Sequence, residues 1–191
     1  RTIQVDMAGN LDAEDYASLF FAAQDLLGHA VDALVAGHYL TNPIPKWRNS
    51  LLQRLPRNWE TSVGIRPTGM NAAQLFWSLQ QTPERPDRRS TMQYALRVMT
   101  FARAVFAWAE RQLLDPSPRA SVAIAWPKAD RTHEDVRLPH LNFDVDFWLA
   151  DDRVILGRLN HFVESLELTP EEFEIVLLFD GVTTAREAEL V

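Results

Sequence analysis

The sequence has no cysteine, which excludes disulfide frameworks, thiolate zinc sites and cysteine nucleophiles. Glycine is scarce, and we find no glycine-rich phosphate loop, Walker motif, kinase pattern or nucleophile elbow. No uninterrupted apolar run reaches the roughly 20 residues that cross a bilayer, and no basic-then-apolar leader opens the sequence. These absences predict a cytoplasmic protein that neither binds a membrane nor acts as an enzyme on its own.

The composition that remains is globular, with 47% hydrophobic and 24% charged residues. Charge divides unevenly along the chain. Residues 1–120 hold 13 Lys+Arg and 11 Asp+Glu (13 − 11 = +2), whereas residues 121–191 hold 6 and 15 (6 − 15 = −9). The split indicates two modules, and the acidic second module argues against nucleic-acid binding, because like charge repels phosphate.

Residues 1–118 are predicted to form a helical domain, because apolar residues recur there at helical spacing. The predicted helices are Ala13–Tyr39 after an Asp12 cap, Lys46–Leu55, Asn71–Gln81 and Ser90–Leu114. Glu60–Gly69 contains two glycines and a proline and is predicted to be a loop. The helix from Ser90 is apolar on most sides, so it should be central to a bundle or lie in an interface.

After Pro118 the apolar period becomes alternating, which is typical of strands. Four strands are predicted: Ser121–Trp126, Leu141–Leu149, Arg153–Leu159 and Phe162–Leu168. The last three have hairpin-length connections and should form an antiparallel meander. A helix should follow from Pro170, capped by Thr169 and ending at Asp180–Gly181, with a further helix from about Ala185. The predicted fold class is therefore α+β, a helical bundle followed by a winged-helix-like module over residues 119–191.

Candidate metal ligands are few. One loosely spaced set could bind a metal: His133, Glu134, His140, Asp144 and Asp146. A polar loop that runs into a half-solvated strand would show the same residues without binding a metal. Asp144 and Asp146 share one predicted strand face and would supply paired carboxylates for acid–base chemistry, but a solvated strand face fits better. We predict no catalytic residue, no metal site and no tight binding of iron, copper or zinc by this chain.

Arginines gather between the third and fourth predicted helices. Arg85, Arg88 and Arg89 lie beside Pro83 and Pro86. The cluster is either a solvated turn or a docking point for an acidic partner. The six tryptophans are many for this length, and they are either core residues or interface anchors.

The three strands, the segment Leu168–Glu172 with its apolar helix, and the segment Phe179–Glu187 resemble the PqqD-like winged-helix family over about residues 138–191. That resemblance implies recognition of a precursor peptide. The whole architecture is similar to the family of small partner subunits of methanobactin biosynthesis. This second resemblance implies a heterodimer with a larger iron-dependent oxygenase that modifies cysteines of the precursor. The iron is then expected on that partner, and no cofactor is expected in this chain.

An outer strand offers unpaired main-chain groups to other chains. Phe162–Leu168 should be outermost, so we predict that a precursor peptide pairs with it. The predicted peptide-binding residues are Phe162, Val163, Glu164, Ser165, Leu166 and Glu167. The alternative is that Ser121–Trp126 covers this edge. Two other functions remain open: a winged-helix transcription regulator, and a metal-dependent enzyme built on residues 133–146.

Overall fold

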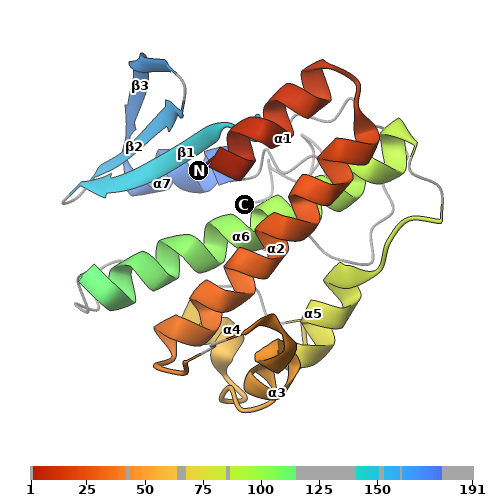
Figure 1. Cartoon of the computed structure of the whole chain (residues 1–191). Coiled ribbons are helices and arrows are strands. Elements are labelled where there is room, and N and C mark those ends of the chain that lie inside the picture. Colours follow the sequence, from red (N-terminus) through yellow and green to blue (C-terminus); the bar gives the residue numbers. More distant parts are fainter. Residues whose placement is uncertain are drawn as a thin grey trace.

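The computed structural model describes residues 2–41, 44–63, 68–84, 87–114, 141–150, 153–159 and 161–177. They form α1 (Thr2–Asp12), α2 (Tyr16–Gly37), η1 (Pro45–Trp47), α3 (Arg48–Leu52), α4 (Trp59–Val63), α5 (Ala72–Gln80), α6 (Arg88–Leu114), β1 (Val145–Ala150), β2 (Arg153–Arg158), β3 (His161–Leu168) and α7 (Pro170–Leu177). The predicted α+β class is confirmed, with a helical N-terminal region and a three-stranded antiparallel sheet (Figure 1).

The long helices α2 and α6 make the centre of the helical region. Phe20 lies 4.9 Å from Tyr94 between ring centroids, and His38 lies 4.7 Å from Trp108, so the two helices run side by side in the same direction (Figure 1). Their facing aliphatic and aromatic side chains are buried in one cluster. Of the two positions expected for the apolar helix, central in a bundle or in an interface, the structure shows the central one, and its burial supplies the main hydrophobic stabilisation of this region.

α2 is also the one described helix that is long and apolar enough, by length and composition, to cross a membrane. Half of its most apolar stretch is buried inside the protein, and core helices of soluble proteins pass the same test. The sequence predicts this helix but no membrane span in it, because Asp25, His29 and Asp32 interrupt the apolar run.

Helix starts differ from the predictions where two residues could serve as the cap. Asp12 ends α1 instead of starting the long helix, and Asp15 caps α2 by accepting a hydrogen bond from the Ser18 N–H at 3.0 Å. Likewise α6 begins before Ser90, because Asp87 accepts from the Ser90 N–H at 2.8 Å. The predicted Glu60–Gly69 loop is wrong in its first part, where α4 forms.

The strand order is β1-β2-β3, with both neighbouring pairs antiparallel. β2 and β3 match the predicted strands to within one residue. α7 starts as predicted: Thr169 Oγ1 accepts from the Glu172 N–H while Glu172 accepts from the Thr169 N–H, which makes a capping box. Phe147 packs on Phe173 at 4.8 Å and joins the core under the sheet to the core of the helical region.

The first strand of the meander is shorter than predicted. β1 begins at Val145 instead of Leu141, because the Val145 N–H bonds to the Asn142 carbonyl at 3.1 Å and closes a turn. Phe143 is completely buried in the core of the helical region. The predictions for Ser121–Trp126 and for the chain beyond Leu177 lie outside the described residues.

Candidate functional site

In the described part of the sheet β3 is an outer strand, as predicted, and β1 is the other outer strand. Among the described strands β3 pairs with β2 alone. The register is regular from Ser165, opposite Gly157, to Leu168, opposite Val154. It shifts between Gly157 and Arg158, so that the next paired residue of β3 is His161. A bulge disrupts the regular spacing of main-chain N–H and C=O groups, so another strand can pair regularly only with the half of β3 that has no bulge.

The regular half of β3 is accessible. Ser165, Leu166 and Glu167 are all exposed, whereas Leu168 is buried against Val154. Leu166 shares the face of Leu168, because side chains alternate along a strand, and it is 55% exposed. An apolar side chain therefore lies open on the α7 side of the edge.

The other predicted peptide-binding residues, Phe162, Val163 and Glu164, lie in the bulged half, of which the structure describes only the backbone. The surroundings of the edge are acidic: Glu167 on β3 and Glu171 and Glu172 at the start of α7 are exposed. A ligand that approaches here meets negative charge, which favours basic or neutral groups.

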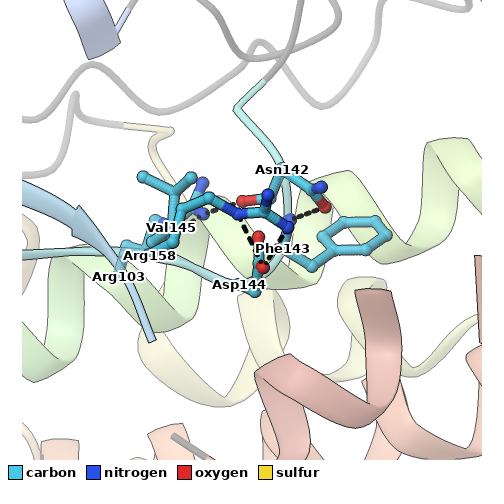
Figure 2. A network of polar contacts seen from close by, with 6 residues as sticks. All are labelled: Arg103, Asn142, Phe143, Asp144, Val145 and Arg158. Atoms are coloured by element: carbon cyan, nitrogen blue, oxygen red, sulfur yellow. Dashed lines mark hydrogen bonds and ion pairs between the residues drawn. The ribbon is translucent and has the colours of Figure 1, made fainter. Parts of the chain in front are cut away.

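A polar junction that no sequence pattern predicted anchors the sheet to the helices (Figure 2). Arg103 projects from α6 and its Nη2 donates to the carbonyls of Asn142 and Val145, each at 2.8 Å. The guanidinium thus binds both ends of the turn that leads into β1. Burial lowers the pKa of Arg103 to about 10, and the negative charges of Asp146 and Asp144 oppose that shift. Arg103 remains a cation at neutral pH.

Asp144 is the acidic member of this junction. Its Oδ2 accepts from Arg158 Nη2 at 2.6 Å and from Nε at 2.9 Å, and the residue is only 2% exposed. The expectation that Asp144 lies on a solvated strand face is therefore wrong. Arg158 sits on β2 directly after the Gly157 shift, so the junction joins α6, the turn before β1 and the central strand. This arrangement fixes the sheet, and with it the β3 edge, relative to α6.

The residues predicted for metal binding or acid–base chemistry do not assemble in the described chain. Asp144 is occupied by Arg158, and Asp146 accepts from the Phe147 N–H at 3.0 Å. Within the described ranges no group of three metal-ligating side chains comes together. His133, Glu134 and His140 lie outside those ranges, so the absence of a metal site stays a prediction.

Two of the three arginines predicted to dock a partner lie within the described residues. Arg88 and Arg89 are exposed in the first turn of α6, next to the capping residue Asp87. Hydrogen bonds from Ser90 lower the pKa of Asp87, and the charge of Arg89 adds to that effect. Arg85 lies outside the described residues.

No protein-family model matches the sequence, and the comparisons find neither a curated protein nor a solved structure similar to it. The resemblance to PqqD-like elements and to methanobactin partner subunits accordingly stays a prediction.

Proposed function

We propose that this chain is an accessory subunit that binds the leader of a precursor peptide along β3. The single observation that carries the proposal is the outer position of β3 with its regular, exposed half at Ser165–Leu168. Main-chain hydrogen bonds to such an edge supply affinity, and side-chain contacts at alternate positions supply selectivity.

The contacts around the edge set the kind of peptide that fits. In a strand added antiparallel to β3, every second side chain lies on the sheet face that carries Leu166. An apolar residue is therefore favoured at the position beside Leu166. The exposed acids at Glu167, Glu171 and Glu172 favour a neighbouring basic residue. Each of these charge contacts is solvated, so its effect is modest and falls as salt rises.

We assign the chemical step to a partner. In this proposal the chain forms a heterodimer with a larger iron-dependent oxygenase, and the oxygenase holds the iron and modifies the peptide's cysteines, as in methanobactin-type biosynthesis. The sheet and α7 are then part of a winged-helix-like recognition module, and the complex works in the cytoplasm without nucleic acid. The resemblance in sequence supports this assignment, and the Arg103 junction supports it physically, since an anchored edge presents the peptide in a fixed position.

Paired proline substitutions test the proposal. Consecutive residues of a strand direct their N–H groups in opposite directions, so one of Ser165 and Leu166 faces β2 and the other faces the free edge. Proline at the inward position breaks the β2–β3 pairing, whereas proline at the outward position leaves it and removes a donor from the edge.

Affinity is measured by fluorescence anisotropy with the labelled precursor peptide, and folding by circular dichroism and melting. Ser165→Ala and Leu166→Ala are the side-chain controls. The variant that keeps its melting temperature should bind about tenfold more weakly than its alanine control, the equivalent of roughly 1.4 kcal/mol. Unchanged affinity in that folded variant would mean that the peptide docks elsewhere.

A further inference from the structure

The outer edges of β1 and β3 differ in the main-chain groups that they leave open. In an antiparallel pair, successive residues direct their N–H and C=O groups alternately toward the partner strand and away from it. The Asp144 carbonyl accepts from the Leu159 N–H at 2.9 Å and so faces β2, one residue beyond the printed register of the pair. By alternation, Val145, Phe147 and Leu149 direct their main-chain groups toward the outer edge of β1.

The first half of this outer edge of β1 is already bonded. The Val145 N–H donates to the Asn142 carbonyl at 3.1 Å, and the Val145 carbonyl accepts from Nη2 of Arg103 at 2.8 Å (Figure 2). The Phe147 N–H donates to Oδ1 of Asp146 at 3.0 Å. A strand that paired here would have to displace a buried cation and a carboxylate, and hydrogen bonds to charged groups are the strong ones.

The outer edge of β3 has no such contacts within the described residues. Gly157 lies opposite Asp146 on β1 and opposite Ser165 on β3. Since Asp146 faces β2, Gly157 bonds toward β1, and Ser165 therefore directs its main-chain groups away from β2. Glu167, two residues later, does the same. Both residues are exposed, and no described residue bonds to these outward groups. The β3 edge is open where the β1 edge is closed.

We propose that Arg103 and Asp146 close the edge of β1 to added strands, so that an extended peptide pairs with the sheet at β3 only. The choice of β3 by the peptide rests on the proposed function, whereas the closure of β1 does not. Unpaired strand edges template association with other chains, and proteins protect them with charged side chains. Arg103 and Asp146 are in this sense specificity-determining residues, because they leave the sheet one place for a strand.

Amide hydrogen exchange of the full chain, resolved by residue with nitrogen-15 NMR, measures the closure without any ligand. Phe147 and Leu149 both direct their N–H groups outward, and Asp146 occupies that of Phe147. After correction for intrinsic rates, Phe147 should exchange at least about tenfold more slowly than Leu149, because only its N–H is hydrogen-bonded in the described chain. Equal exchange of the two amides would contradict the closure.

Two variants of Asp146 isolate its carboxylate. Asp146→Ala removes the acceptor, and Asp146→Asn, the matched control, keeps a side-chain oxygen in its place. Exchange of Phe147 should rise about tenfold in the alanine variant and stay slow in the asparagine variant. In the purified chain the strand available to an opened edge is that of a second copy, so sedimentation velocity should find more dimer in Asp146→Ala than in Asp146→Asn at equal concentration. Identical exchange or identical sedimentation of the two variants would overturn the proposal. Should Asp146→Ala fail to fold, the comparison of Phe147 with Leu149 in the unaltered chain decides.

The precursor peptide tests the choice of β3. Saturating peptide should slow exchange at Ser165 and Glu167 and leave Leu149 unchanged, and protection of Leu149 would refute the choice. Peptide that protects neither edge would contradict the proposed function, while the exchange of Phe147 and the sedimentation of the Asp146 variants would still decide whether β1 is closed.

Discussion

Gly37→Ala should destabilise the protein although alanine is the better helix former. Gly37 is the last residue of α2, and a Cβ there would lie 2.4 Å from Cζ3 and 2.7 Å from Cη2 of Trp108. Trp108 is buried in the main core and cannot move away freely. Overpacking of this kind costs about 1–3 kcal/mol. The helix propensity of alanine returns at most about 1 kcal/mol, which leaves a net loss of up to about 2 kcal/mol.

Gly9→Ala is the matched control. Gly9 lies in α1, and a Cβ there meets nothing within 4 Å. The same substitution should therefore stabilise the protein by about 0.5–1 kcal/mol. Urea unfolding measures both changes, and in a chain of this size each kcal/mol moves the melting temperature by roughly 2–4 °C. The two variants should shift in opposite directions.

A second background isolates the contact. In Trp108→Ala the ring is gone, so adding Gly37→Ala should then cost nothing or even stabilise. The reasoning fails if Gly37→Ala and Gly9→Ala shift stability alike, or if the cost of Gly37→Ala is the same with and without the Trp108 ring.

Three further predictions concern stability. Phe101→Ala or Trp108→Ala should each cost about 3–5 kcal/mol in urea unfolding, because both are buried in the central helix pair; near-unchanged unfolding would contradict that placement. Burial lowers the pKa of His38, so the stability that it contributes is present above its ordinary value of 6.5 and declines as pH falls below that value; His38→Gln should remove this part of the pH slope, and an identical slope would be evidence against it. Arg103→Met loses two hydrogen bonds from a cation and should cost about 3 kcal/mol, with faster amide exchange in β1, whereas unchanged exchange there would show that the junction does not hold the sheet.

The sheet and the helix after it could be predicted largely because their signals are local. β2, β3 and α7 follow from alternation, short turns and the Thr169–Glu172 capping box, all of which involve neighbours in sequence. The outer position of β3 followed from the meander in the same way.

The polar junction could not be predicted, because it depends on contacts between distant segments. Asn142, Phe143 and Asp144 alternate as a strand does, yet Phe143 enters the helical core and Asp144 pairs with Arg158 fourteen residues later. Arg103 lies in an apolar helix, where its sequence neighbours say nothing of the two carbonyls that it binds. Periodicity reports which way a side chain points, and it does not report which partner it meets.

Amide hydrogen exchange along β3, with and without the precursor peptide, tests the central claim most directly. The account predicts that binding slows exchange of the N–H groups of Ser165–Leu168 that face the free edge, while those already bonded to β2 change little. Saturating peptide that leaves every β3 amide unchanged, and protects another surface instead, would contradict the claim.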